Sequence, residues 1–381
     1  MDLKCLICGS DMEINRKSKL REAKCVNCGL IAWYYEEQTK MKHNVFRDYF
    51  DKWVKILGKY YKLNYVDGFA GVGIYYDDKG EFHFGSPLIA VETIIDNKKE
   101  ATLILIDNNK EVISNLRKLI RYKGFDKVQT LKIHFINDDF NKTINKILKA
   151  TEGNITPTFI FIDPFGFGDL KFRTIKNIME KIPRAEILIT FMYNAISRFL
   201  ENKNLSKTFN EIFGSDKWRN FVGYSDKSRE EEIISFYISQ LKKVSKFVTP
   251  FMLTFYAKRR TYYYLIHLTN HYKGAVIMKS SFAKCSFGRP YWLGKYSSQK
   301  TLIEIGDAKV RSVSNFLLEK YNGKSVPFLK IIEDNIDSTE YLGSEFKDAV
   351  KRLEREGIVS VSYTHLRAHE TSLHLVCRLL L

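Results

Sequence analysis

The clearest pattern in the chain lies at residues 63–73, which have the sequence LNYVDGFAGVG. The first five residues have the apolar character of a short buried strand, and they run directly into a G-x-G turn. A strand that ends in an acid before such a turn is typical of a doubly wound parallel sheet, in which a nucleotide-type ligand lies over the first loop. Glycines there let the backbone approach the ligand closely, because they lack a Cβ atom.

Three later segments repeat the strand pattern, and each ends in an acid. They are residues 102–107 with Asp107, residues 131–136 followed by Asp138 and Asp139, and residues 158–162 followed by Asp163. Helical segments separate these strands, and the alternation predicts a parallel sheet with its ligands at the carboxyl edge. A dinucleotide site is disfavoured, because Tyr76 occupies the last glycine position of a G-x-G-x-x-G motif.

Asp107 is a candidate for binding a ribose. In doubly wound proteins an acid at the tip of the second strand accepts hydrogen bonds from the ribose hydroxyls. The alternative for Asp107 is an N-cap of the helix that follows it. The sequence leaves both roles open.

Several motifs together resemble class I S-adenosylmethionine-dependent methyltransferases. They are the D-x-F-A-G-x-G loop, Asp107, the D-F-N segment at 139–141 and the D-P-F-G segment at 163–166. A narrower resemblance, to the three-Cys-motif partner proteins, rests on Lys42-His43, residues 85–88 (GSPL), residues 264–267 (YLIH) and Met278-Lys279. It covers residues 42 to about 360. The resemblance implies a Rossmann-like methyltransferase fold and an association with a separate protein that bears a three-cysteine motif.

The resemblance also implies roles for individual residues around S-adenosylmethionine. Asp67, Gly71 and Gly73 would bracket its methionine end, Asp107 would hold the ribose, and Asp139 would lie by the adenine edge. His43 and Phe69 complete the predicted cofactor set. The alternative for His43 is a structural role at the start of its helix. Asp138 competes with Asp139 for the adenine role, and either residue could instead cap the helix that starts at Phe140.

Asp163, Pro164 and Phe165 are the predicted catalytic residues. They occupy the place where amino-methyltransferases of nucleic acid carry D/N-P-P-F/Y, whose acid accepts hydrogen bonds from the target amine and whose aromatic ring stacks on the base. The chain departs from that motif, since Phe165 replaces the second proline and Gly166 stands at the aromatic position. A structural Asp-Pro turn is the alternative for Asp163.

Four of the six cysteines lie near the N-terminus, as Cys5-x2-Cys8-x16-Cys25-x2-Cys28. Two C-x2-C pairs at this spacing predict a zinc ribbon, in which two knuckles supply four thiolates to one tetrahedral ion. Four thiolates leave no open coordination position, so we expect the zinc to be structural. Chance pairs or a redox dithiol are the alternative.

The patterns divide the chain into an α/β core and smaller units. We expect a zinc ribbon at 1–36, a Rossmann-like methyltransferase domain at 40–300 with a helical insertion at about 197–246, and a winged-helix-like module at 308–361. Residues 74–84 suggest a small hairpin, either a flap or a plain surface hairpin. Residues 363–381 resemble translated vector sequence and are predicted to be a non-native tail. The alternative there is a metal site at His365 and His369.

The composition favours a polyanionic partner. Lys and Arg number 61 against 44 Asp and Glu, which gives a formal charge of +17. The absence of a long apolar run argues against a membrane span, and without an apolar leader we expect a cytoplasmic protein. Three functions remain open: a methyltransferase acting on nucleic acid with a partner protein, a non-catalytic scaffold of the same fold, and a phage-defence accessory protein that binds a nucleotide or a partner.

Overall fold

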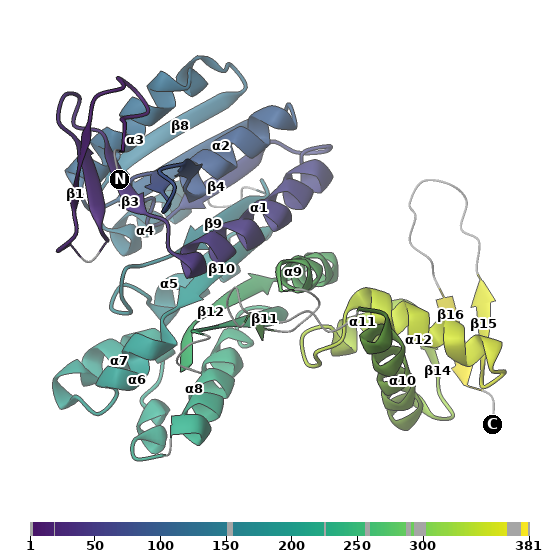
Figure 1. Ribbon diagram of the computed structural model, residues 1–381. Coiled ribbons are helices and arrows are strands. Elements are labelled where there is room, and N and C mark those ends of the chain that lie inside the picture. Colours follow the sequence, from purple (N-terminus) through teal and green to yellow (C-terminus); the bar gives the residue numbers. More distant parts are fainter. Residues whose placement is uncertain are drawn as a thin grey trace.

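The centre of the protein is a mixed sheet that brings distant parts of the chain together. The computed structural model describes residues 3–18, 20–150, 155–224, 226–255, 260–286, 291–292, 302–363 and 375–379. The strands of the sheet are β4 (Leu63–Asp67), β7 (Ala101–Asp107), β8 (Leu131–Asn137), β9 (Thr158–Ile162), β10 (Ala185–Phe191), β11 (Phe247–Phe255), β12 (Arg260–Thr269) and β13 (Tyr291–Trp292). Their spatial order is β13-β11-β12-β10-β9-β4-β7-β8 (Figure 1).

The strand order fits the Rossmann-like methyltransferase fold. Counted along the chain, the first seven strands lie in the order 3-2-1-4-5-7-6. The first five pair in parallel, while β12 runs antiparallel between β10 and β11. The parallel arrangement that the sequence predicts is therefore confirmed, and the carboxyl ends of β4, β7, β8 and β9 meet at one edge.

Helices cover both faces of the sheet, which explains why β9 and β10 are apolar along nearly their whole length. The helices α1 (Glu37–Leu57), α2 (Ser86–Asp96), α3 (Lys110–Tyr122) and α9 (Tyr272–Cys285) contribute to the core on one face. The other core takes in α4 (Phe140–Ala150), α5 (Phe172–Lys181), α6 (Tyr193–Phe199), α7 (Ser206–Phe213) and α8 (Asp226–Leu241).

Helix α1 buries a stripe of aromatic side chains, and their spacing in the sequence predicts such a helical face. Phe46, Phe50 and Trp53 are buried at helical spacing, and the ring of Phe46 stacks on Phe161 of β9 at 5.2 Å. Gly58 follows as the C-cap residue. The stripe is core, so it does not serve as a base-stacking surface.

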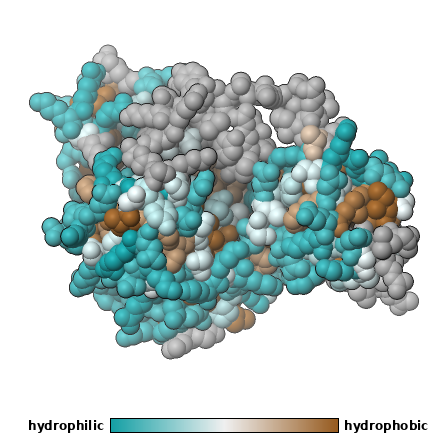
Figure 2. Space-filling view, turned by 90° about the horizontal axis from the view of Figure 1, so that it is seen from below, coloured by the Kyte–Doolittle hydropathy of each residue, from teal (hydrophilic) through white to brown (hydrophobic). Residues whose placement is uncertain are grey.

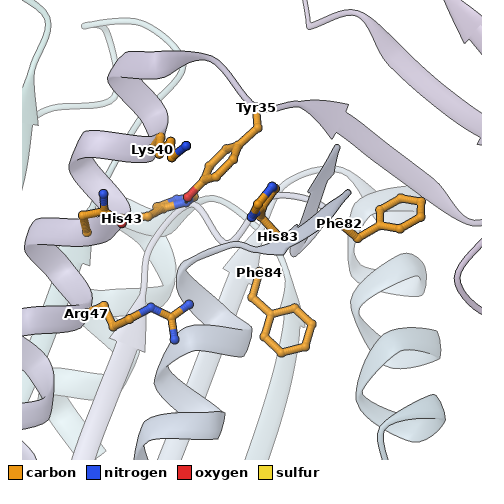
Figure 3. A pocket seen from close by; sticks show the side chains of 8 residues that line it. Tyr35, Lys40, His43, Arg47, Phe82, His83 and Phe84 are labelled. Carbon is orange, nitrogen blue, oxygen red and sulfur yellow. The ribbon is translucent and has the colours of Figure 1, made fainter. Parts of the chain in front are cut away.

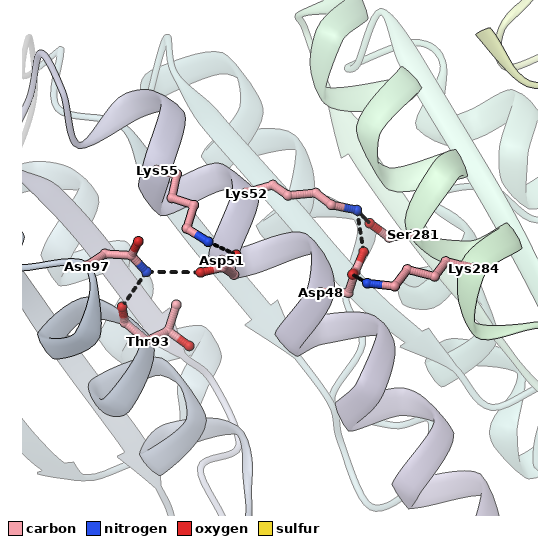
Figure 4. Close-up of polar contacts among 8 residues, drawn as sticks. All are labelled: Asp48, Asp51, Lys52, Lys55, Thr93, Asn97, Ser281 and Lys284. Carbon is pink, nitrogen blue, oxygen red and sulfur yellow. Dashed lines mark hydrogen bonds and ion pairs between the residues drawn. The ribbon is translucent and has the colours of Figure 1, made fainter. Parts of the chain in front are cut away.

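The polar side of α1 connects it to two neighbouring helices (Figure 4). Asp51 accepts a hydrogen bond of 3.0 Å from the side chain of Asn97, which follows α2. Asp48 pairs with both Lys52 and Lys284, the latter from α9. Most of these groups are partly exposed, so these contacts orient the helices more than they stabilise them.

A second sheet joins the N-terminal segment to the predicted hairpin. It contains β1 (Met12–Asn15), β2 (Glu22–Cys25), β3 (Ile31–Tyr34), β5 (Ile74–Tyr76) and β6 (Phe82–Phe84), in that spatial order. The hairpin β5–β6 is confirmed. Strand β3 pairs with β5 in parallel through Trp33 and Tyr75, so the cysteine-bearing segment is continuous with the loop that follows β4.

The C-terminal unit has three helices and a small sheet. Its elements are α10 (Leu302–Tyr321), β14 (Ser325–Pro327), α11 (Phe328–Asn335), α12 (Gly343–Arg355), β15 (Val359–Tyr363) and β16 (Leu375–Leu379), with the strands in the order β14-β16-β15. Part of the segment predicted to be a non-native tail thus pairs within this sheet. His365 and His369 lie outside the described residues.

Lys279 of α9 ties the C-terminal unit to the sheet. Its ammonium is largely buried and donates to the carbonyls of Ile336 and Thr339, at 2.8 and 2.5 Å. Burial lowers the pKa of Lys279 to about 8. Val248 of β11 adds a backbone N–H bond of 3.2 Å to the carboxylate of Asp337.

Hydrophilic residues cover most of the described surface in the view of Figure 2, and apolar residues show as small separate groups. Among the helices of the described residues, none is both long enough and apolar enough to cross a bilayer.

Candidate functional site

The four N-terminal cysteines converge on one point. Their sulfur atoms all lie within 4.8 Å of one another, with 3.5 Å between the Sγ atoms of Cys5 and Cys28 and the same distance between those of Cys8 and Cys25. A tetrahedral zinc ion with Zn–S bonds of about 2.3 Å needs sulfur atoms about 3.8 Å apart. The cluster is therefore compatible with a structural zinc site.

The backbone around the cysteines has the form of two knuckles. Gly9 and Gly29 have φ values of +71° and +66°, and their N–H groups donate to the carbonyls of Cys5 and Cys25. Only glycine adopts this left-handed conformation at low cost, which explains its position directly after each pair. Ile7 N–H and Cys28 N–H point at Cys5 Sγ and Cys25 Sγ, a pattern that suits thiolates.

Asp67 ends β4 and is fully buried. It accepts hydrogen bonds from the hydroxyl of Tyr65 at 2.7 Å and from the N–H of Phe69 at 3.4 Å. Burial raises the pKa of Asp67 to about 6, the charge of Asp163 adds to the rise, and bonds from Ser86 and Tyr65 oppose it. Asp67 and Asp163 are thus close enough for their charges to interact, although they come from different strands.

Asp107 ends β7 and faces the glycine loop. One carboxylate oxygen accepts the N–H of Gly71 at 3.2 Å, and the other accepts the N–H of Asn109 at 2.8 Å. Burial raises the pKa of Asp107, although both backbone bonds oppose the rise. The N-cap of α3 is Asn109, whose side chain accepts from Glu111 N–H, so the capping alternative for Asp107 does not hold.

Asp138 and Asp139 follow β8. The Oδ1 of Asp139 accepts the N–H of Lys142 at 2.9 Å, which is the geometry of a cap on α4. Asp138 accepts the N–H of Asp139 and pairs with Lys146 at 3.1 Å. The capping alternative thus describes Asp139, and within the described part of the chain its second oxygen accepts no hydrogen bond.

Protein side chains lie close to the glycines of the loop. A Cβ atom at Gly73 would lie 2.4 Å from Leu116 and 2.6 Å from Leu88, so close helix packing explains this glycine. A Cβ atom at Gly71, which has a φ of +60°, would lie 3.0 Å from the ring of Trp33. Phe69 contacts the ring of Phe140, with their centroids 5.5 Å apart.

Asp163 forms an ion pair with Lys42, a residue of α1. Both side chains are mostly buried, at 20% and 10% exposed, so the ammonium compensates a carboxylate that has lost much of its water. Burial raises the pKa of Tyr65, Tyr75 and Tyr263, and the charge of Asp163 adds to it, so their hydroxyls stay protonated. Pro164 is buried beside this group.

Phe165 is 51% exposed, and its ring contacts Trp33 edge to face at 5.1 Å. A half-exposed aromatic ring next to Asp163 has the free surface that base stacking needs. Trp33 itself is buried and comes from β3, which places the cysteine-bearing segment against the candidate catalytic residues.

His43 is buried beneath the hairpin. Its Nδ1 lies 3.2 Å from the hydroxyl of Tyr35 (Figure 3). Its ring contacts that of Tyr75, with the centroids 5.2 Å apart. Burial lowers the pKa of His43 well below its usual value, so the imidazole is neutral. Its described contacts connect it to the hairpin, and none of them is to the glycine loop.

Sequence reasoning missed four residues at the sheet edge. Lys42 stands out in the sequence only through the family resemblance, and no motif includes Trp33. Thr190 of β10 and Asn194 of α6 have buried side-chain oxygens for which the described part of the chain offers no hydrogen-bond partner. Adjacent strands β9 and β10 bring the end of β10 close to Asp163. The sequence M-Y-N directly after an apolar strand was the available signal for Asn194.

Two of the basic side chains between the knuckles already have partners within the protein. Lys24 pairs with Glu111 at 2.6 Å, and the guanidinium of Arg21 lies 3.3 Å from the ring centroid of Tyr34. Arg16 and Lys17 are exposed. Lys19 lies outside the described residues.

No protein-family model and no curated protein matches the chain. Among solved structures it is similar to a Legionella pneumophila protein of the family model DUF519, with 13% identity, a TM-score of 0.44, and 66% of this chain and 92% of that chain covered. It is also similar to spermidine synthase from Thermotoga maritima, with 10% identity, a TM-score of 0.36, and coverage of 69% and 76%. A third is a Clostridium thermocellum protein provisionally described as an rRNA methylase, with 12% identity, a TM-score of 0.31, and coverage of 57% and 92%. The structural neighbours are methyltransferase-like, and the fold assignment itself rests on the strand order of the sheet.

Proposed function

We propose that the chain is an S-adenosylmethionine-dependent methyltransferase that acts on nucleic acid. The observation that carries the proposal is the meeting of Asp67, Asp107 and Asp163 at one edge of a sheet with the methyltransferase strand order. Ligands of open α/β sheets lie at this edge, outside the carboxyl ends of the strands.

The residues present fit S-adenosylmethionine. Each oxygen of Asp107 accepts one backbone N–H and retains lone-pair capacity for a ribose hydroxyl. Asp67 offers a buried carboxylate beside the glycine loop for the positively charged methionine end. When bound, the cofactor supplies an activated methyl group.

Asp163 would orient the methyl acceptor. Lys42 occupies one carboxylate oxygen, and the other oxygen is left to accept a hydrogen bond from a target N–H and to hold the proton that the nitrogen loses. Phe165 supplies a stacking surface for a base next to that oxygen. The departure from D-P-P-F leaves the target atom open between an exocyclic amine and another nucleophile.

Two further features support a nucleic-acid substrate. The formal charge of +17 favours a polyanion. The three helices and the strand order β14-β16-β15 suit a winged-helix-like module, which can bind nucleic acid or dock a protein. From the resemblance we include a partner protein with a three-cysteine motif as a candidate component of the active complex.

The deciding experiment is transfer of a labelled methyl group from S-adenosylmethionine to DNA, RNA and protein substrates. The wild type should label one nucleic acid, and Asp163→Ala should abolish labelling while cofactor affinity persists. Asp169→Ala, an acid on the loop after β9, is the matched control and should retain activity. Cofactor binding without any methyl transfer would favour the scaffold function. The ion pair between Lys42 and Asp163 is also compatible with that function. Failure to bind the cofactor would favour the accessory-protein function.

A further inference from the structure

A cavity of about 260 Å³ lies between α1 and the hairpin β5–β6. Lys40, His43, Asn44 and Arg47 line one side of it, and this spacing places them on one face of the helix. Strand β6 lines the opposite side. In Figure 3 the side chains of Lys40 and Arg47 extend from α1 toward Tyr35, His83 and Phe84. None of the acids at the sheet edge lines this cavity.

The cavity is positively charged. Lys40 and Arg47 are its two full cations, and no carboxylate is among its lining residues. Lys40 has no ion-pair partner within the described part of the chain. Arg47 pairs through one nitrogen with Glu92 at 3.0 Å, which leaves other guanidinium N–H donors free. An arginine fork beside a lysine is a typical arrangement for phosphate binding.

A half-buried tyrosine hydroxyl and a buried imidazole complete the floor of the cavity. The hydroxyl of Tyr35 and Nδ1 of His43 lie 3.2 Å apart. Burial raises the pKa of Tyr35 to about 12, so the hydroxyl keeps its proton and can donate to the neutral imidazole. In that arrangement the ring proton of His43 is on Nε2, which is then a further donor.

Aromatic rings form the remaining wall. Tyr35 and His83 stack with centroids 4.8 Å apart and an interplanar angle of 26°. His83 is oriented by Asp77, whose Oδ2 lies 2.9 Å from its Nε2. Phe84 is half-buried on the same strand. An inorganic anion would not stack on these ring faces, whereas a nucleotide presents a phosphate and a flat ring together.

The cavity adjoins the candidate catalytic group through a short chain of contacts. His43 follows Lys42, the partner of Asp163, and the ring of Tyr75 lies 5.2 Å from His43 and 6.2 Å from Trp33. A polynucleotide that presents one base to Phe165 therefore has a neighbouring nucleotide within reach of this cavity.

We propose that this cavity binds one nucleotide unit of the polynucleotide substrate, with its phosphate on Lys40 and Arg47 and its base against the rings of Tyr35, His83 and Phe84. The proposal rests on the nucleic-acid substrate proposed above. It assigns the backbone contact to α1 and the hairpin.

The test is equilibrium binding of fluorescent single-stranded RNA and DNA of about 12 nucleotides, measured by anisotropy over a salt series without cofactor. The double variant Lys40→Gln/Arg47→Gln should bind at least tenfold more weakly, and its salt slope should fall by about 0.7, because one phosphate contact is lost. Phe84→Ala should weaken binding about tenfold with an unchanged slope, because stacking releases no counterions.

The control variant is Lys59→Gln/Lys62→Gln, in the turn between α1 and β4. It matches the test pair because Lys62 has one ion pair, with Glu100, and Lys59 has none among the described residues. If the wild type binds the oligonucleotides and both double variants bind equally well, the cavity is not the site. If polyglutamate displaced the fluorescent oligonucleotide as well as an unlabelled oligonucleotide does, the proposal would also be overturned, in favour of an acidic peptide. If the wild type binds neither oligonucleotide at low salt, the nucleic-acid substrate fails, and this proposal fails with it.

Discussion

The indole of Trp33 and the ring of Phe165 lie edge to face, 5.1 Å apart, although one belongs to the cysteine-bearing segment and the other to the D-P-F segment. Trp33 also lies against Gly71 of the glycine loop that follows β4. Asn115 of α3 reinforces the connection, since its amide bonds both the N–H and the carbonyl of Ile31 and also the carbonyl of Val72. Folding of the cysteine-bearing segment and the shape of the candidate active site are therefore coupled.

Zinc removal should weaken cofactor binding as well as remove the metal. We expect one zinc per chain by elemental analysis, and Cys5→Ser/Cys28→Ser should lose it because two thiolates cannot hold the ion in a structural site. The rise in melting temperature that S-adenosylmethionine produces should also shrink, because Trp33 loses its support. Cys285→Ser in α9 should change neither property. Stoichiometric zinc in the double variant would exclude the four-cysteine site.

Asp107→Ala should weaken S-adenosylmethionine binding. A charge-assisted hydrogen bond contributes about 1.5–3 kcal/mol, so losing the ribose contact should lower affinity by at least about tenfold. The measurement is the ligand-induced shift in melting temperature, taken relative to each variant without ligand. Asp126→Ala, in the exposed 3-10 turn after α3, should keep the full shift. An undiminished shift in Asp107→Ala would place the ribose elsewhere.

The substitution Asp67→Asn should increase the stability of the protein relative to the wild type more and more as the pH rises. Burial raises the pKa of Asp67 from its ordinary value of 3.8 to about 6 in the folded protein. The folded wild type is therefore most stable below pH 3.8, where Asp67 is protonated, and it loses stability as the pH rises through 6. Asparagine does not titrate. The difference in unfolding free energy between the variant and the wild type should therefore grow by about 2 kcal/mol from pH 4.5 to pH 7.5. Urea unfolding without cofactor measures it, and a constant difference would contradict the raised pKa.

The parts of the fold that local pattern determines were predictable. The apolar runs at 63–67 and 158–162 coincide with β4 and β9, and the aromatic stripe of α1 is buried as its spacing predicts. The two knuckle glycines also follow from sequence, because a left-handed turn after each C-x2-C pair excludes most other residues.

The contacts that assemble the site were not predictable in the same way. Lys42 and Asp163 are separated by 121 positions, and only the packing of α1 across the sheet brings them together. The parallel pairing of Trp33 with Tyr75 depends on a register that neither strand encodes alone. The strand at 375–379 is likewise recognised only through its pairing with β14 and β15.

The nucleic-acid contact of the cysteine-bearing segment should depend on Arg16 and Lys17, which are exposed. Charge reversal at both residues should weaken oligonucleotide binding and lower the salt slope by about 1.4 on single strands, since each neutralised phosphate contributes about 0.7. Phe165→Ala should weaken binding without changing the slope, because its contribution is stacking. Lys59→Glu, in the turn between α1 and β4, should leave the slope nearly unchanged. An unaltered slope in the Arg16→Glu/Lys17→Glu variant would mean that this segment supports the active site through Trp33 and does not contact the backbone.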